Sequence, residues 1–215
     1  MPRFPSSSSR APLLLERLGA LYPEATCALH WRTPYELLVA TMLSAQCTDV
    51  RVNKVTPALF ERFPDAAAAA AVEPEEVEPY IRSTGFFHNK AKAIVGASRL
   101  LMERHGGEVP ASMEELVGLP GVARKTANVV LAVAFGINAG LTVDTHVRRL
   151  SQRLGLTLQS DPRRIEVDLM KLLPQSDWEN LSIRLIVHGR TVCTARHPAC
   201  DGCGIGDLCP SRLKG

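Results

Sequence analysis

The sequence predicts an all-α protein, and three observations support this. Apolar side chains recur at helical spacing through most of the chain, no segment shows the alternation of a half-buried strand, and residues that favour helix starts precede the periodic segments. With 215 residues, the chain can bury a core as one large domain or as two small ones.

The first half of the chain contains three such segments. Pro34 begins one whose inward positions follow at helical spacing, namely Leu37, Leu38, Thr41, Met42 and Ala45. The alanine run 66–71 lies between Pro64 and Pro74 and predicts a short helix, because alanine is the strongest helix former. The third segment has its apolar face at Ile94, Ala97 and Leu101.

Helix starts are also marked in the second half. Ser112 and Glu115 form a capping box before a short helix that ends near Gly118. The pair Asp161-Pro162 begins a helix whose inner face is Ile165, Leu169 and Leu172. Ser176 with Glu179 marks the start of the next helix.

The N-terminus and the overall hydropathy predict the location of the protein. Residues 1–12 are rich in Pro and Ser, lack the apolar segment of a signal peptide, and predict a disordered arm. No apolar run reaches the length that spans a membrane. We therefore expect a cytoplasmic protein without a membrane partner, and we expect it to be a monomer.

Four cysteines near the C-terminus predict a metal centre. They form the run C-x6-C-x2-C-x5-C at Cys193, Cys200, Cys203 and Cys209. Four thiolates in one short irregular stretch would repel one another and lose conformational entropy unless a metal held them. A structural zinc site would show two close pairs, so the spacing fits a [4Fe-4S] cluster better than zinc or disulfides. Cys27 and Cys47, outside the run, are expected to be free, buried thiols.

The charge distribution indicates a partner more clearly than the net charge of +3 does. Basic residues gather between 144 and 164, at Arg148, Arg149, Arg153, Arg163 and Arg164. Acidic residues gather elsewhere, at Glu73, Glu75, Glu76 and Glu78. A basic face of this kind suits the phosphates of a nucleic acid, although solvated helix faces would give the same pattern.

The segment LPGVARKTANVVL, residues 119–131, predicts a helix-hairpin-helix. Pro120 and Gly121 interrupt one helix, and a second begins near Lys125 with Ala127, Val130, Leu131 and Ala134 on one face. The turn leaves the N–H groups of Gly121, Val122 and Ala123 without helical partners, so they can hold one DNA phosphate without reading sequence. Taken alone, the segment could also be an ordinary helix turn with Lys125 on the surface.

Four motifs in order resemble those of the endonuclease III family, DNA glycosylases with an associated lyase activity. They are LSAQCTD at 43–49, LPGVARKTAN at 119–128, VDTHVRR at 143–149 and the cysteine run. The resemblance implies an all-α, two-domain helix-hairpin-helix glycosylase fold with a C-terminal [4Fe-4S] cluster loop. Residues 27–138 would form a six-helix barrel, residues 13–26 plus 139–215 a cluster domain, and damaged double-stranded DNA would lie across the cleft between them.

The resemblance also implies roles for single residues. The catalytic lysine of the family corresponds to Lys125 and its catalytic aspartate to Asp144, with oxidised pyrimidines in duplex DNA as the substrate. Gln46 corresponds to the residue that enters the space left by the flipped base. Further candidate DNA contacts are Phe86, Gly121, Val122, Ala123, His146, Arg148 and Arg190.

The chemistry of the reaction gives an independent reason for this pair. A lysine amine that attacks the sugar C1′ expels the base and leaves a Schiff base that promotes β-elimination of the 3′ phosphate. The amine must be neutral to attack, and the first turn of a helix disfavours the ammonium form. Asp144 could move protons or stabilise the cationic sugar, and it could equally be a helix N-cap.

The hairpin and the loop after Gly85 depart from the family pattern. Ala123 replaces the usual second glycine of the hairpin, which is expected to reduce backbone freedom where an N–H should face phosphate. Phe86 and Phe87 replace an aliphatic wedge, and an aromatic ring there could stack on the orphaned base or simply pack in the core.

Two other functions remain open. An adenine-mismatch glycosylase would share the hairpin, the aspartate and the cluster, but such enzymes lack a lysine at the position of Lys125 and continue into a further domain. A non-catalytic iron-sulfur DNA-binding protein would hold a duplex without cleaving it.

Overall fold

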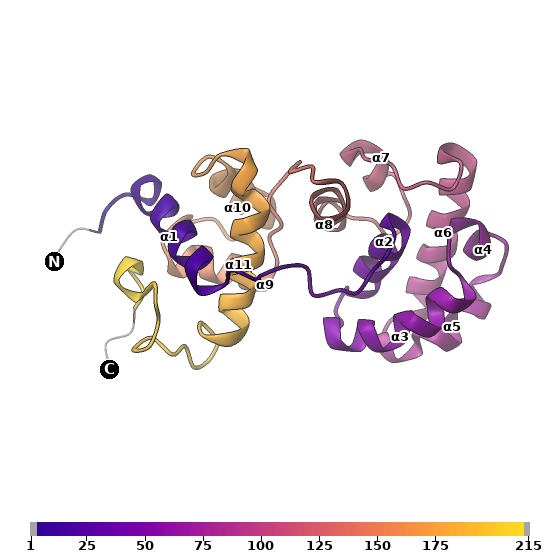
Figure 1. Cartoon of the computed structure of the whole chain (residues 1–215), viewed down its shortest axis with the longest axis horizontal. Helices are drawn as coiled ribbons and strands as arrows, with labels where there is room; N and C mark the ends of the chain where they lie inside the picture. Colours follow the sequence, from indigo (N-terminus) through magenta and orange to yellow (C-terminus); the bar gives the residue numbers. More distant parts are fainter. Residues whose placement is uncertain (1–3, 213–215) are drawn as a thin grey trace. The chain divides into compact units, whose positions relative to one another are not determined.

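The computed structural model describes residues 4–212, and within that range the chain forms helices and no strands (Figure 1). The prediction of an all-α protein is confirmed. The α-helices are α1 (Ser7–Leu21), α2 (Pro34–Leu43), α3 (Asp49–Arg62), α4 (Ala66–Ala70), α5 (Pro74–Ile81), α6 (Phe87–His105), α7 (Met113–Val117), α8 (Arg124–Phe135), α9 (Thr145–Arg153), α10 (Pro162–Met170) and α11 (Trp178–Thr191). Short 3-10 helices occupy η1 (Arg82–Thr84), η2 (Gln175–Asp177) and η3 (Gly206–Leu208).

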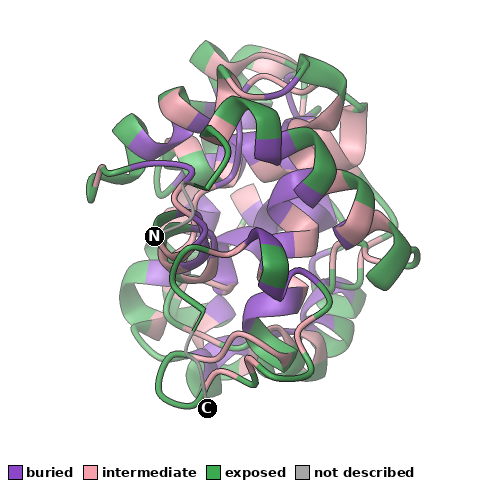
Figure 2. Cartoon of the chain, turned by 90° about the vertical axis from the view of Figure 1, so that its left-hand side faces the viewer, coloured by how far each residue is buried: buried purple, intermediate pink, exposed green. Residues whose placement is uncertain are grey.

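The chain divides into two compact units. The central unit is Ala28–Ala139, and the terminal unit combines the residues up to Cys27 with those from Gly140 onward. Figure 2 shows helices with buried residues on one side and exposed residues on the other, as expected for amphipathic helices that pack around a core.

In the central unit, α6 packs against α4 and α5, and α2 packs against α3 and α8. Leu37, Leu38 and Leu43 of α2 are at most 1% exposed, which makes α2 an interior helix. Its start is defined by sequence, since Thr33 caps it through the N–H of Glu36 and Pro34 occupies its first turn.

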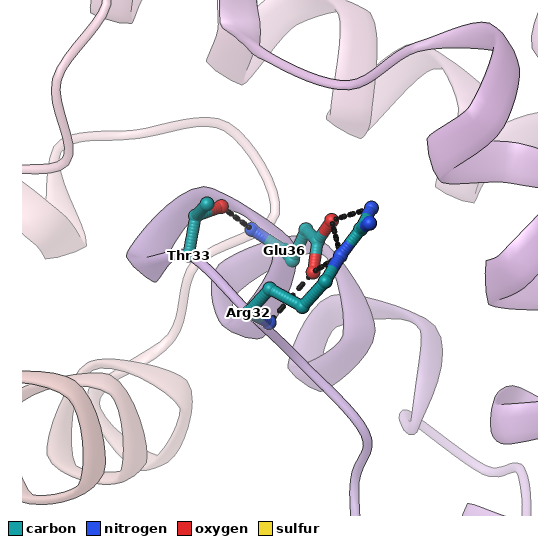
Figure 3. A network of polar contacts seen from close by, with 3 residues as sticks. All are labelled: Arg32, Thr33 and Glu36. Atoms are coloured by element: carbon teal, nitrogen blue, oxygen red, sulfur yellow. Dashed lines mark hydrogen bonds and ion pairs between the residues drawn. The ribbon is translucent and has the colours of Figure 1, made fainter.

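The buried carboxylate of Glu36 is fully paired where the chain enters α2. Arg32 donates to it from its backbone N at 2.7 Å, and from its guanidinium Nη2 at 2.6 Å (Figure 3). A buried carboxylate is costly unless it is paired and hydrogen-bonded, and here it is both. This pair therefore stabilises the entry to the central core.

In the terminal unit, α11 packs against α1 and α9, and α9 also contacts α10. The core contains Leu14 and Leu18 of α1 together with Leu150 and Leu185, and three of the four clustered cysteines pack against it. The N-terminal helix is thus an integral part of the unit that carries the cysteine run.

The predicted disordered arm at residues 1–12 is wrong for its second half, because α1 begins at Ser7. Ser6 caps the helix through the N–H of Ser9. Arg10 is 4% exposed and donates to the carbonyls of Leu208 at 3.0 Å and Gly155 at 3.1 Å. These distant partners order a stretch that its composition alone assigns to a flexible arm. Residues 1–3 lie outside the described range.

Candidate functional site

The hairpin between α7 and α8 is a tight turn that needs a glycine. The N–H of Val122 donates to the carbonyl of Leu119 at 3.1 Å, with Pro120 and Gly121 between them. Gly121 has φ +75°, the left-handed value that the third position of a type II turn requires. A Cβ on Gly121 would lie 2.6 Å from the Cβ of Ala93 in α6, so both conformation and space demand glycine.

The turn changes which amides can hold a phosphate. The expectation that the N–H of Val122 is available is wrong, because that group closes the turn. Ala123 has φ −88° and ψ 165°, an extended conformation that any residue adopts. The expected loss of backbone freedom at Ala123 is therefore also wrong. Gly121 and Ala123 are exposed, whereas the side chain of Val122 is buried.

Lys125 is exposed at the second position of α8. No side chain caps this helix, in contrast to α2 or α9, so its first-turn N–H groups keep their affinity for an anion. The opposite face of α8 is buried as predicted, at Ala127, Val130 and Leu131. The lysine thus projects from a fixed helix whose start is open to an anionic ligand.

Gln46 and Phe86 share an unusual backbone. Among residues 4–212 they are the two non-glycine residues with positive φ, at +53° and +50°. Phe86 is 63% exposed, which excludes core packing for its ring. Phe87 is half-buried, with the guanidinium of Arg82 5.6 Å from its ring centre. Of the two aromatic residues, Phe86 is the one available to a ligand.

Asp144 is the N-cap of α9. Its Oδ1 accepts hydrogen bonds from the N–H groups of His146 and Val147, both at 2.8 Å. The capping alternative is thus confirmed, and the second oxygen, Oδ2, takes no part in this cap. The cap fixes the carboxylate in one orientation, and it does not exclude a second role for Oδ2.

The other candidate DNA contacts of the terminal unit differ in exposure. Arg148 and Arg190 are exposed, whereas His146 is half-buried. A Cβ on Gly189 would lie 2.9 Å from the His146 Nδ1, so α11 approaches the first turn of α9 closely. His146 is therefore partly a packing residue, and the two arginines are the more exposed side chains.

Two arginines of the basic segment point inward instead of forming a surface face. Arg149 donates to the carbonyls of Gly189 at 2.8 Å and Cys193 at 2.9 Å. Arg153 donates to the carbonyl of Thr194 at 2.8 Å and approaches the Sγ of Cys193 at 3.2 Å. The interpretation of this segment as one basic face is wrong for these two, because their guanidinium groups donate to backbone carbonyls of α11 and of the cysteine loop.

The four clustered cysteines line one cavity in the terminal unit. Its empty volume, counted out to open solvent, is about 390 Å³, and its remaining walls include Leu150, His188, Ile205 and Arg212. Within residues 4–212, no three His, Cys, Asp or Glu side chains are grouped as a single metal ion requires. Zinc needs four sulfurs within about 2.3 Å of one point, whereas a cubane cluster holds its thiolates further apart. The residues fit a [4Fe-4S] cluster better than zinc.

The surroundings of the cysteines also fit a cofactor of positive charge. Burial raises the pKa of the Cys203 and Cys209 thiols, and their cysteine neighbours raise it further. Four thiolates therefore need a metal to be ionised together. His188, 1% exposed, lies with its Nε2 3.5 Å from the Sγ of Cys203 and its Nδ1 2.7 Å from the hydroxyl of Tyr22.

Cys27 and Cys47 form no disulfide. Both thiols were expected to be buried, and both are half-buried.

The sequence did not predict the roles of three polar residues that hold parts of the fold together: Arg10, Lys90 and His188. Each is a polar residue at a helical core position, and that placement was the available signal.

Two family models match the chain. The HhH-GPD superfamily of base excision DNA repair proteins matches residues 39–175, and the iron-sulfur binding domain of endonuclease III matches residues 193–209. Endonuclease III of Synechocystis sp. is 66% identical over 206 residues, covering 96% of this chain and 94% of that protein. Endonuclease III of Escherichia coli K12 is 41% identical, covering 94% of this chain and 95% of that protein.

Solved structures give the same result. A non-covalent endonuclease III–DNA complex superimposes with a TM-score of 0.90 at 43% identity, covering 95% of both chains. A trapped endonuclease III–DNA covalent intermediate matches with the same TM-score and identity, covering 95% of this chain and 96% of that one. Within residues 4–212, no helix is both long and apolar enough to cross a membrane.

Proposed function

This chain belongs to the endonuclease III family, and from that premise we propose that it removes oxidised pyrimidines from duplex DNA and cleaves the abasic site by β-elimination. The chain is an all-α helix-hairpin-helix glycosylase with a [4Fe-4S] cluster, as the resemblance implied. The observation that carries the proposal is Lys125, an exposed amine at the uncapped start of the second hairpin helix.

Recognition begins with phosphate. The N–H groups of Gly121 and Ala123, together with the first-turn amides of α8, suit one phosphate of the backbone. Arg148 and Arg190 supply further contacts that do not depend on sequence, with His146 beside them. Binding to undamaged duplex is thus weak and falls as salt rises.

Gln46 and Phe86 are the proposed contacts at the lesion. A base must leave the stack before an amine can reach its sugar, and the gap it leaves has to be filled. Gln46 enters that gap, and the exposed ring of Phe86 stacks on the orphaned base.

Lys125 then carries the chemistry. Its Nζ attacks C1′, the C1′–N bond breaks, and the base leaves with a proton. The C1′–O4′ bond then breaks as O4′ takes up a proton, so that the sugar ring opens and a Schiff base joins Nζ to C1′. Loss of a C2′ proton breaks the C3′–O bond and releases the 3′ phosphate, and water frees the lysine. Asp144 uses Oδ1 to cap α9 and Oδ2 to stabilise the cationic sugar or to move a proton.

The four cysteines 193, 200, 203 and 209 are the proposed ligands of the cluster. All four side chains line the cavity described above, which supports this assignment. When bound, the cluster supplies cross-links between separate parts of the loop, and the reaction itself needs no electron transfer. We further propose that the enzyme acts as a monomer, in the cytoplasm with its DNA.

A duplex containing thymine glycol tests the proposal. Borohydride added during turnover should leave a covalent protein–DNA adduct, and Lys125→Gln should abolish the adduct and the strand cleavage while duplex binding stays within about twofold. An adduct formed by Lys125→Gln would refute the assignment. Excision of adenine from mismatches by the wild type, or binding without any cleavage, would favour the two alternatives.

Asp144→Asn separates capping from catalysis. Asparagine caps a helix as well as aspartate does, so stability should change by less than about 1 kcal/mol. Loss of the charge should lower the single-turnover rate by roughly a hundredfold or more. A destabilised variant with normal specific activity would show that Asp144 serves only as a cap.

A further inference from the structure

Lys90 is a buried cation in the central unit. It lies in the second turn of α6 and is 7% exposed. Its Nζ donates to the carbonyl of Leu43 at 2.8 Å and to the carbonyl of Thr84 at 2.9 Å. Leu43 is the last residue of α2 and Thr84 is the last of η1, so one ammonium joins the ends of two helices.

Each of these carbonyls lies just before a residue of unusual backbone. Gln46 follows Leu43 by three residues, and Phe86 follows Thr84 by two. They are the two non-glycine residues of positive φ within residues 4–212. Such a conformation is unfavourable and persists only where the surroundings determine it. Lys90 supplies a shared anchor immediately before both.

Local bonds continue from these anchors. The hydroxyl of Thr84 donates to the carbonyl of Ile81 at 2.8 Å, and the N–H of Lys90 donates to the carbonyl of Phe86 at 3.0 Å. On the other side, the N–H of Cys47 donates to the carbonyl of Ser44 at 3.1 Å. Short backbone segments that are themselves hydrogen-bonded therefore connect the two anchored carbonyls to Gln46 and to Phe86.

Packing alone would not require a lysine here. An apolar side chain of the same length would fill the space without the cost of removing an ammonium from water, and burial indeed lowers the pKa of Lys90. A charged lysine can do what an apolar side chain cannot, because it binds the carbonyls that helix C-termini present at the negative end of the helix dipole.

The hairpin turn rests on α6, which carries Lys90, and on α2, whose last carbonyl Lys90 binds. A Cβ on Gly121 would lie 2.6 Å from Ala93 of α6 and 3.1 Å from Met42 of α2. The proposed phosphate contact and the two proposed lesion contacts thus share one support within the central unit.

We propose that Lys90 is a positioning residue for lesion recognition: by binding the carbonyls of Leu43 and Thr84 it holds Gln46 and Phe86 as a pair, at the spacing that an extrahelical base leaves. This rests on the proposed function, because it takes these two side chains as lesion contacts. Lys90 itself does not touch DNA, and its enclosed amine is no alternative nucleophile to Lys125.

The test uses the full-length, cluster-loaded protein in a Lys125→Gln background, so that the lesion is bound but not consumed. The duplex carries thymine glycol opposite 2-aminopurine, whose fluorescence reports the stacking of the orphaned base. Lys90→Met keeps the length of the side chain and removes its donors. Lys92→Met, an exposed lysine of the same helix, is the matched control.

Lys90→Met should lower the preference for lesion over undamaged duplex by roughly tenfold and reduce the fluorescence change, with affinity for undamaged duplex within about twofold. Lys90→Arg, which retains two donors, should keep the preference, as should Lys92→Met. Once Gln46 and Phe86 are both replaced by Ala, Lys90→Met should cause no further loss of preference.

The outcomes separate the two proposals. Equal loss of lesion and undamaged binding in Lys90→Met, or a further loss in the double-alanine background, would show a merely structural role and overturn the inference. Should Lys90→Met fold poorly, a folded Lys90→Arg protein that loses the preference would overturn it as well. If the wild-type protein cleaves the lesion and the Lys90→Met protein keeps its full preference, the role of Lys90 is overturned and the proposed function stands. Wild-type protein without lesion preference or cleavage would overturn both.

Discussion

The two units bury polar groups in different ways. In the central unit the buried carboxylate of Glu36 is fully paired with Arg32, and the ammonium of Lys90 has two carbonyl partners. In the terminal unit, Oε2 of Glu179 is buried with no hydrogen-bond partner among the described residues. In the central unit the buried charges of Glu36 and Lys90 have partners within the unit. In the terminal unit Glu179 has an oxygen without one.

The cysteine loop is a second feature that distinguishes the terminal unit. Between α11 and Arg212 the chain contains only the short helix η3, and it is held to the unit by side chains that bind its carbonyls, Arg10, Arg149 and Arg153. The loop contributes Ile205 and Leu208 to the core, and the cofactor supplies further stability by linking its cysteines. We therefore expect that loss of the cluster destabilises the terminal unit first and leaves the hairpin of the central unit folded.

The strongest test of this expectation is Cys200→Ser. Loss of one ligand should lower the iron content and the yield, and the melting temperature of the terminal unit should fall by roughly 10 °C or more. Iron analysis, absorbance of the purified protein and calorimetry measure these effects. Cys47→Ser, in the central unit, should change the melting temperature by less than about 2 °C. Equal melting of the two variants would contradict the expectation.

Glu179→Gln tests the cost of the unpaired carboxylate in the terminal unit. Burial raises the pKa of Glu179 from 4.5 to about 7. Between these values the unfolded chain releases a proton that the folded chain retains, so the stability falls as pH rises through this window. Glutamine removes the titration, and at pH 8 the variant should be more stable than wild type by up to about 3 kcal/mol.

Urea unfolding at pH 5.5 and pH 8 measures this effect. The difference between the two proteins should be larger at pH 8 than at pH 5.5. Glu36→Gln serves as the control from the central unit, where loss of the charge and of one acceptor oxygen weakens the bonds to Arg32 and should destabilise the protein. A Glu179→Gln protein with the same pH dependence as wild type would show that this carboxylate is solvated in solution.

Local signals predicted most of the helices. Ser112, Asp144 and Asp161 each cap the helix that follows, as their type and position indicate. The cysteine spacing likewise indicated the cofactor, and the hairpin motif predicts a phosphate site. These features depend on residues close together in the chain, which is why the sequence reveals them.

Long-range partners explain what the sequence could not predict. Helix α1 is ordered by Arg10, three of whose four carbonyl partners lie more than 140 residues away. Lys90 reaches Leu43, 47 residues earlier, and a lone lysine at a helical core position gives no sign of which carbonyls it binds. The role of Val122 in closing the turn also required coordinates, since the motif does not show which amide is used.

The smallest expected effects concern the two hairpin positions, Gly121 and Ala123, and they test whether the central unit relies on its own backbone geometry. Gly121→Ala places a Cβ 2.6 Å from Ala93 at φ +75° and should cost about 2 kcal/mol, with weaker duplex binding. Ala123→Gly restores the usual family residue at an extended position, where glycine brings no new conformation. It should therefore cost a few tenths to about 1 kcal/mol through unfolded-state entropy and leave duplex affinity within about twofold. Denaturant titration and binding at fixed salt distinguish the two variants. A marked gain of affinity in Ala123→Gly would show that the bound hairpin adopts a backbone that alanine resists.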